Sequence, residues 1–365
     1  MSKKKLNIVL DIGKTNVKLI FLDEKGQFFK EIKTKQTLKF YKKKISYLNS
    51  EKIINWLLLN LNKFSAVYNF KKFVCTTHGA TVAFVNHHDQ EIIASTDYEY
   101  KYDKFSKDFQ NLAPSFKTSL TPHLEGGLNI GQQIYYLNRI FPEIIRNTKF
   151  ILSYPQYITW KLTGNYSSEI SYIGCHSFLW NFKKNNYSSL VNKLKIAKKF
   201  PKINKAWEKI GNLLIKDNKI NVLNGVHDSN ASYLYFKNSS LKNFTLVSTG
   251  TWYIIFNQST KLSKLNPKLD MLCSIDIFGN HVPTMRFMGG REYDTLCDLL
   301  KITNKTVSKI NEKDLIRNLI YPSFASAGPF RINKNLTKIK TIKLNNNQRY
   351  SLVCIYMAFT LNFCL

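Results

Sequence analysis

Residues 11–18, D-I-G-K-T-N-V-K, link two short apolar runs, L-N-I-V-L at 6–10 and V-K-L-I-F-L at 17–22. Runs of this composition favour β-strands, so the polar residues between them are predicted to form a hairpin turn. Gly13 has no Cβ, and backbone N–H groups in such a turn are able to face a phosphate. We therefore predict that the turn residues bind nucleotide phosphates; they are Gly13, Lys14, Thr15 and Asn16. Asp11 is predicted to hold Mg²⁺, directly or through water. The alternative for this fragment alone is an ordinary hairpin with an Asp-x-Gly turn.

The segments after this hairpin predict an α/β layer. Residues 27–34 read as a third strand and residues 73–77 as a fourth. Between them, one helical face of residues 51–64 carries the apolar side chains Ile53, Ile54, Leu57, Leu58 and Leu61. The order β-β-β-α-β is typical of the start of a ribonuclease-H-like layer. Further helices are predicted over 128–141, over 157–162 and over the lysine-rich stretch 187–216.

A second strand-turn-strand pattern, at 244–249 and 252–256, echoes the first. Its turn offers hydroxyl groups and a glycine amide to a phosphate; the residues are Ser248, Thr249, Gly250 and Thr251. Taken alone, such a sequence is just as often a plain hairpin loop. Two glycine turns rich in hydroxyl groups, one in each half of a duplicated plan, predict that one triphosphate is held from both sides.

The segment G-V-H-D-S-N, residues 225–230, lies between a short predicted strand at 220–223 and a helix that opens at Asp228 or Ser229. Phosphoryl transfer needs a carboxylate that orients or deprotonates the acceptor hydroxyl, while positioning and electrostatics supply the rest of the catalysis. We predict that Asp228 is this catalytic base. The alternative is a helix N-cap, since Asp is among the preferred capping residues.

In this order, D-I-G-K-T-N-V-K, G-V-H-D and S-T-G-T-W resemble the FGGY carbohydrate kinase family, within the actin, hexokinase and heat-shock ATPase superfold. Residues 154–164, Y-P-Q-Y-I-T-W-K-L-T-G, are similar to the family's helix that ends in Leu-Thr-Gly. The resemblance extends from Leu6 to the end of the chain. It implies an α/β fold of two ribonuclease-H-like, actin-like ATPase domains around a cleft. We place these domains at 1–236 and 237–365, with the boundary at the polar stretch K-N-S-S-L-K.

By this resemblance the chain is an ATP-dependent kinase that transfers the γ-phosphoryl group to a hydroxyl of a ketose, a pentulose or 6-deoxyhexulose, or of a related polyol. Asp11 and Asp228 would meet Mg²⁺, and the two glycine turns would hold ATP. His227 resembles the His-Asp pair of the kinases that act on L-rhamnulose and L-fuculose.

A strand-end segment, T-T-H-G-A at 76–80, resembles the acceptor-sugar segment of the same family. The resemblance implies that Thr77, His78 and Gly79 contact the sugar and that His78 donates to a hydroxyl. The alternative for His78 is a structural hydrogen bond, the commoner role of a lone strand-end histidine.

The composition fits a folded chain of two domains. Its 365 residues are 44% hydrophobic, which excludes a disordered chain. A net charge of +30 would suit a polyanion, but the lysines are spread along the whole chain, so we expect no nucleic-acid partner. No stretch predicts a membrane span or a secretory signal, and the six cysteines form no C-x-x-C pair. We expect a cytoplasmic protein with reduced thiols.

The sequence ends at Leu365, inside a helix predicted over 349–363. Members of the FGGY family continue with a glycine- and serine-rich loop that holds the adenosine, so we expect an incomplete C-terminal domain. Three alternatives stay open at this point: another actin-like phosphotransferase or ATPase, a polyanion binder, and a truncated, inactive sugar-kinase homologue. The sequence leaves the oligomeric state open, and a homodimer is compatible with it.

Overall fold

The computed structural model describes residues 3–239, 241, 243–322, 324, 327–330, 339–340 and 343–365. Contacts divide the chain into two compact units. Unit 1 comprises Met1–Tyr235 and Ser274–His281, and unit 2 comprises Phe236–Cys273 and Val282–Leu365. The short segment that returns to unit 1 had no signal in the sequence. Within the polar stretch 237–242, Ser240 and Lys242 lie outside the described residues.

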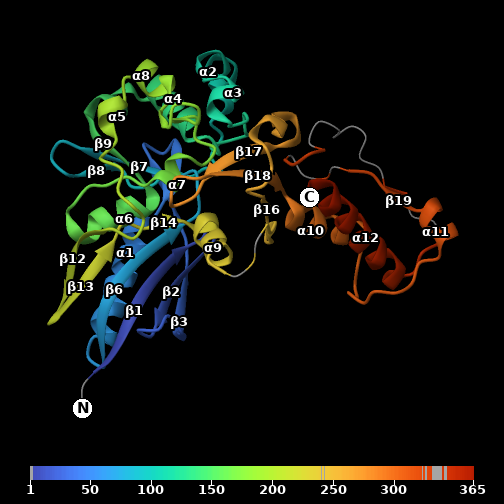
Figure 1. Cartoon of the computed structure of the whole chain (residues 1–365), viewed down its shortest axis with the longest axis horizontal. Coiled ribbons are helices and arrows are strands. Elements are labelled where there is room, and N and C mark those ends of the chain that lie inside the picture. Colours follow the sequence, from blue (N-terminus) through green and yellow to red (C-terminus); the bar gives the residue numbers. More distant parts are fainter. Residues whose placement is uncertain are drawn as a thin grey trace. The chain divides into compact units, whose positions relative to one another are not determined.

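The main sheet of unit 1 has the strand order β12-β13-β6-β1-β2-β3, and β14 also pairs with β6. These strands are β1 (Lys4–Ile12), β2 (Asn16–Leu22), β3 (Phe28–Lys35), β6 (Tyr68–Thr77), β12 (Lys209–Ile215), β13 (Asn218–Leu223) and β14 (Val226–His227). β1, β2 and β3 are antiparallel neighbours, whereas β6 runs parallel to β1, β13 and β14. In Figure 1 the parallel strands β1 and β6 start near the N-terminus, and β14 and α9 (Asp228–Lys237) lie at their far end.

Helix α1 (Ser50–Phe64) packs on this sheet through the face that the sequence predicts. Ile53, Leu57 and Leu61 are fully buried, and the ring of Phe64 lies edge-on to Phe21 of β2 at a centroid distance of 5.3 Å. A hairpin of β4 (Leu38–Tyr41) and β5 (Ile45–Leu48) precedes α1 and was not predicted. It escaped prediction because each of its strands has only four residues.

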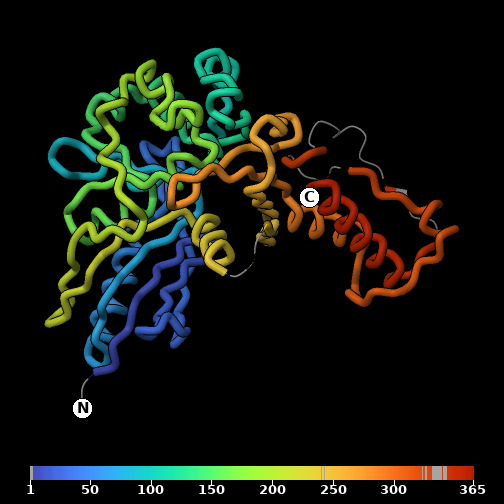
Figure 2. Tube along the Cα trace, viewed as in Figure 1, coloured from blue at the N-terminus to red at the C-terminus, as the bar shows by residue number. Residues whose placement is uncertain are grey.

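The prediction of a helix over 187–216 is wrong. The stretch instead contains β11 (Asn186–Tyr187), α8 (Ser189–Lys193), a 3₁₀ turn (Ala197–Lys199) and β12. Ser188 caps α8, and Lys195 just beyond it adopts a left-handed φ of 58°. Lysine favours helices only weakly, and the pairing of β12 with β13 outweighs that preference. Figure 2 shows β12 and β13 as an edge hairpin.

Other predicted helices of unit 1 are confirmed, and a second sheet accompanies them. The helices are α4 (Ile130–Ile140), α6 (Tyr154–Thr163) and α9, and Gly164 ends α6 with a left-handed φ of 74°. The second sheet has the order β8-β7-β9, with β7 (Val82–Asn86), β8 (Glu91–Ile93) and β9 (Thr148–Ser153). The shorter elements are α2 (Ser106–Leu112), α3 (Phe116–Ser119), α5 (Pro142–Asn147), α7 (Ile170–Ile173) and β10 (Trp180–Asn181).

Unit 2 contains most of a sheet of order β15-β16-β18-β17, of which Ser274, Ile275 and His281 belong to unit 1. Its elements are β15 (Leu246–Ser248), β16 (Tyr253–Phe256), β17 (Met271–Ile275), β18 (His281–Phe287), α10 (Gly289–Leu299), α11 (Glu312–Arg317), β19 (Leu319–Ile320), β20 (Ile339–Lys340) and α12 (Asn346–Cys364). The core includes Ile255, Phe287, Leu296 and Val353, so α10 and α12 share one apolar cluster with the sheet. Among the described residues, no helix has the length and apolar character of a membrane span.

Glu169 is a fully buried carboxyl at the start of α7. It accepts hydrogen bonds from the backbone N–H groups of Ser171 (3.0 Å) and Tyr172 (3.2 Å) and from the Ser171 hydroxyl (2.6 Å). Burial raises the pKa of Glu169 to about 7, because it outweighs these hydrogen bonds, and nearby Asp276 adds to the rise.

We expect Glu169→Gln to change the pH dependence of stability. The folded state binds the Glu169 proton more tightly than the unfolded state does, so the stability that this group contributes falls as pH rises from about 4.5 to about 7. Glutamine does not titrate, so the variant should gain on the wild type over this range, by on the order of 3 kcal/mol. Urea unfolding between pH 4.5 and 7.5 measures the difference. Glu24→Gln, at an exposed carboxyl, is the control, and a Glu169→Gln profile parallel to the wild type contradicts the prediction.

Candidate active site

The ends of three neighbouring strands gather the predicted site residues of unit 1. The register pairs Asp11 of β1 with Thr76 of β6, and His227 of β14 with Thr77 of β6. The N–H of His78 donates to the carbonyl of Ile12 at 2.9 Å, which extends the β1–β6 pairing by one step. Because these strands are parallel, their carboxyl ends meet at one edge of the sheet. The structure therefore places Asp11, His78 and Asp228, which follows β14, at the same edge.

Gly225 allows β14 to approach β6. Its φ is +89°, and a Cβ on it would lie 2.7 Å from the carbonyl oxygen of Cys75. An L-residue would be strained there and would also collide with backbone. The glycine of G-V-H-D thus fixes the position of the strand that leads into Asp228.

Asp228 is the first residue of α9, and its two oxygens have different surroundings. Oδ1 accepts from the backbone N–H of Ser229 (2.6 Å) and from its hydroxyl (3.2 Å), and lies 3.3 Å from His227 Nε2. Oδ2 has no hydrogen-bond partner among the residues that the structure describes. The side chain is 38% exposed. One oxygen therefore holds the carboxylate in place, and the other is available to an incoming hydroxyl.

His227 is buried beside Asp228. Its Nδ1 lies 3.2 Å from Asn230 Nδ2, and the ring stands edge-on to Tyr172. A Cβ at Gly79 would come within 2.8 Å of His227 Nε2, so this glycine leaves room for the imidazole. Burial lowers the pKa of His227, but Cys175 and Asp228 raise it by more, and the net shift is upward.

Asp11 faces Lys18 across the hairpin, with Oδ2 3.8 Å from Nζ. Burial raises its pKa; Lys18 opposes the rise, whereas the charges of Asp228 and Glu31 add to it. Carboxylates that repel each other across a site are stabilised by a cation. Among the described residues, no group of three or more His, Cys, Asp or Glu side chains is placed to hold a metal. Mg²⁺ commonly takes one or two carboxylates as ligands and completes its coordination shell with water and phosphate oxygens. The two carboxylates of Asp11 and Asp228 therefore fit Mg²⁺.

The turn between β1 and β2 offers free backbone donors. Gly13 N–H donates within the turn to the carbonyl of Asn16 (2.9 Å), whereas the N–H groups of Lys14 and Thr15 have no partner in the described part of the chain. Thr15 and Asn16 are exposed. This arrangement suits a phosphate. The side chain of Lys14, however, donates to Asp97 Oδ1 and lies 3.5 Å from Glu99 Oε2.

His78 is buried, with one free ring nitrogen. Its Nδ1 lies 3.0 Å from the carbonyl oxygen of Gly79 and donates to it, and its Nε2 has no partner among the described residues. Burial lowers the pKa of His78 to about 4, so the ring is neutral near pH 7. Nε2 is therefore a hydrogen-bond acceptor rather than the donor that we expected. The Thr77 hydroxyl donates to the His78 carbonyl at 2.9 Å, which holds this segment in place.

Sequence reasoning missed Asp97, Tyr98 and Glu99, which follow β8. Asp97 is 3% exposed. The Tyr98 ring contacts Lys14 Nζ, 4.7 Å from its centroid, and the ring of His78, at a centroid distance of 5.3 Å. A signal was present: A-S-T-D follows the apolar strand end I-I at 92–93, as H-G follows the strand end T-T at 76–77. Small polar residues after a buried strand mark positions where function gathers.

The second glycine turn lies in unit 2, between β15 and β16, as predicted. Thr249, Gly250 and Thr251 are exposed. A Cβ on Gly290 would lie 2.2 Å from the carbonyl oxygen of Gly250, so α10 begins directly against this loop. Within unit 2 the start of α10 therefore supports one side of the loop, and the exposed side can contact a ligand.

The comparisons with known proteins match both halves of the sequence. The model for the "FGGY family of carbohydrate kinases, N-terminal domain" matches residues 6–233. The chain belongs to the FGGY family of carbohydrate kinases. The family's C-terminal domain, "Carbohydrate kinase FGGY, C-terminal domain", matches residues 241–365 of this FGGY kinase. The predicted α/β kinase fold of two domains and the phosphotransferase class with an alcohol acceptor are thereby confirmed.

Solved structures resemble this FGGY kinase over nearly the whole chain. A carbohydrate kinase from Novosphingobium aromaticivorans is 27% identical, with a TM-score of 0.84, covering 100% of this chain and 81% of that one. A ligand-bound xylulose kinase from Lactobacillus acidophilus shares the fold at 15% identity and a TM-score of 0.77, covering 98% and 77%. Plasmodium falciparum glycerol kinase with ADP shares the fold at 12% identity and a TM-score of 0.75, covering 99% of this chain and 78% of that one. A search of the curated proteins finds no match.

Proposed function

We propose that this FGGY kinase transfers the γ-phosphoryl group of ATP to a hydroxyl of a ketose, a pentulose or 6-deoxyhexulose, or of a related polyol, with Asp228 as the base. One observation carries the proposal. A half-exposed carboxylate with a free Oδ2 lies at the same sheet edge as a buried neutral histidine with a free Nε2. A polyol supplies several hydroxyl groups to such acceptors.

The residues act on the acceptor as follows. Asp228 Oδ2 takes the proton of the acceptor hydroxyl, whose oxygen bonds to the γ-phosphorus, while the bond from that phosphorus to the β–γ bridging oxygen breaks and ADP leaves. His78 Nε2 accepts from a second hydroxyl and orients the sugar. Ser229 and His227 contact Asp228 Oδ1 and so hold the carboxylate with Oδ2 toward the acceptor hydroxyl.

Each glycine turn is assigned, within its own unit, to nucleotide phosphates. In unit 1 the N–H groups of Lys14 and Thr15, which have no partner among the described residues, suit phosphate oxygens. In unit 2 the half-buried Ser248 and the exposed Thr249, Gly250 and Thr251 suit them as well. Mg²⁺ would be held by Asp11 and Asp228 together with the phosphates, and it would neutralise charge on them. The His227–Asp228 pair supports an acceptor of the L-rhamnulose or L-fuculose type. Mg²⁺ as the metal and a homodimer as the assembly stay predictions.

The test is ADP release by the purified chain, with ATP and Mg²⁺, over a panel of ketopentoses, 6-deoxyketohexoses and polyols. We expect turnover with one acceptor class and a phosphorylated product by mass spectrometry. ATP use that does not depend on any acceptor, or turnover with none of them, contradicts the proposal and favours an inactive homologue.

A further inference from the structure

A partly buried ion pair connects the β1–β2 turn to the segment after β8. Lys14 Nζ donates to Asp97 Oδ1, and Glu99 Oε2 lies 3.5 Å from the same ammonium group. The backbone N–H of Glu99 donates to Asp97 Oδ1 (3.0 Å), and the Ser46 hydroxyl donates to Oδ2 (3.0 Å). Both oxygens of Asp97 are thus occupied, and its side chain cannot turn away from Lys14.

This pair lies beside the predicted acceptor histidine. Lys14 Nζ lies 4.7 Å from the centroid of the Tyr98 ring, and the centroid of the His78 ring lies 5.3 Å from it in an edge-on arrangement. The Tyr98 carbonyl accepts from Gly127 N–H at 2.9 Å, and a Cβ on Gly127 would lie 2.8 Å from Tyr98 Cα. This close backbone contact with Gly127 fixes the position of the Tyr98 segment, and with it the position of Asp97 beside Lys14.

The charges near His78 are unfavourable to an anionic acceptor. Lys14 and the basic side chain of His227 both act on the charge of His78, and each faces a carboxylate, Asp97 and Asp228 respectively. Glu99 adds one more negative charge beside Lys14. His78 itself is neutral near pH 7, because burial lowers its pKa to about 4. An acceptor carboxylate would lose water here and would meet, among these described groups, no cation without a counter-charge, whereas hydroxyl groups would meet hydrogen-bond acceptors.

We propose that the Lys14–Asp97 pair makes the acceptor site select uncharged polyhydroxy acceptors against aldonates, because Asp97 neutralises the lysine that would otherwise bind an acceptor carboxylate. The inference rests on the proposed function and narrows its substrate class. It also gives Lys14 a positioning role on the acceptor side, in addition to the phosphate contact predicted for its backbone.

The test compares an uncharged ketose with D-gluconate as acceptors for the wild type and for Asp97→Asn. Asparagine keeps one carbonyl oxygen to accept from the Glu99 N–H, and its NH₂ group can donate to the Ser46 hydroxyl oxygen. It leaves the Lys14 charge without its closest counter-charge. We expect the kcat/KM ratio of gluconate to ketose to rise by about tenfold or more, the effect of removing one carboxylate charge near the acceptor. The double variant Lys14→Met/Asp97→Asn removes both charges and should lose this gain.

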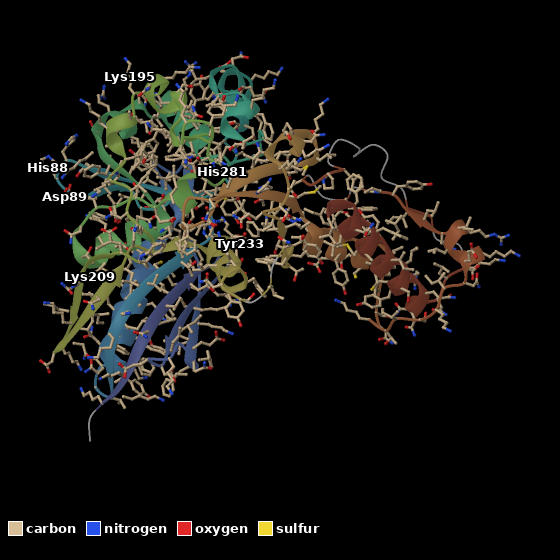
Figure 3. The ribbon with its side chains drawn as sticks, viewed as in Figure 1. His88, Asp89, Lys195, Lys209, Tyr233 and His281 are labelled. Atoms are coloured by element: carbon tan, nitrogen blue, oxygen red, sulfur yellow. The ribbon has the colours of Figure 1, made fainter. Side chains whose placement is uncertain are left out.

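Asp89→Asn is the matched control. Asp89 lies on the turn between β7 and β8 (Figure 3). Its carboxylate pairs with Lys149 at 2.8 Å. This variant removes a carboxylate from a lysine pair outside the site, and it should leave the acceptor ratio unchanged.

Either of two results overturns the inference: a wild type that phosphorylates gluconate as well as the ketose, or a ratio that Asp97→Asn leaves unchanged. If no acceptor is phosphorylated at all, the proposed function fails, and calorimetric binding of ketose and gluconate to the same variants still decides the charge selection. Circular dichroism of Asp97→Asn before the assays excludes an unfolded variant, and Lys14→Met alone should not admit gluconate.

Discussion

Asp228→Asn is expected to lower kcat by about 10²- to 10⁴-fold, the range that a positioned general base contributes. The asparagine can still accept from the Ser229 N–H, so the side chain stays in place, but it cannot take the hydroxyl proton. Ketose binding should change much less than kcat, because His78 and the surrounding backbone are untouched. The measurement is steady-state ADP release with the acceptor that the panel identifies, together with calorimetric binding of that acceptor.

Asp217→Asn provides the control for the same chemical change. Asp217 lies exposed in the turn between β12 and β13, in the same unit as Asp228. It should leave both kcat and KM as in the wild type. An Asp228→Asn variant that keeps its turnover within about threefold would remove the base assignment, since positioned proton transfer contributes far more than that. A loss of folding in Asp228→Asn is detected by its melting temperature.

Much of the fold follows from local patterns. The β1–β2 hairpin was predicted because apolar alternation and a glycine turn lie within one short segment, and α1 because its apolar residues repeat at helical spacing. The helix predicted over 187–216 failed because the signals that decide this stretch are not local. The last residues of this stretch form β12 because β12 pairs with β13, which in turn pairs with β6. A lysine-rich composition does not predict either of these strand pairings.

The site divides in the same way. Asp11, His78 and Asp228 were found because each ends or follows a strand, and the roles assigned to them stay predictions until the variants are measured. The Lys14–Asp97 pair could not be predicted from the sequence, because its partners are 83 residues apart and neither segment carries a signal for contact with the other. Lys14 was assigned to phosphate from its place in the turn, and only the fold shows that its side chain is paired with a carboxylate.

Asp11→Asn is expected to lower kcat by about 10²- to 10³-fold and to raise the Mg²⁺ concentration needed for half-maximal turnover, because it removes one of the two carboxylates assigned to the metal. Stability should move the other way. Burial raises the pKa of Asp11, so the charged carboxylate costs the folded state free energy, a cost that grows as pH rises above its ordinary value of 3.8. The neutral asparagine avoids it, and urea unfolding at pH 7 should show a variant at least as stable as the wild type.

Lys18→Met separates the two roles open to Asp11. Lys18 Nζ lies 3.8 Å from Asp11, and its side chain is 42% exposed, so the pair contributes little to stability on its own. If Asp11 serves only to pair with Lys18, both variants should show the same modest effect on turnover. If Asp11 serves the metal, Lys18→Met should keep the wild-type Mg²⁺ dependence while Asp11→Asn loses it. A charged metal ligand in a desolvated site lowers the stability of the fold, so replacing it should not lower stability further. An Asp11→Asn variant that is less stable and has an unchanged Mg²⁺ requirement would therefore give Asp11 a structural role in the hairpin.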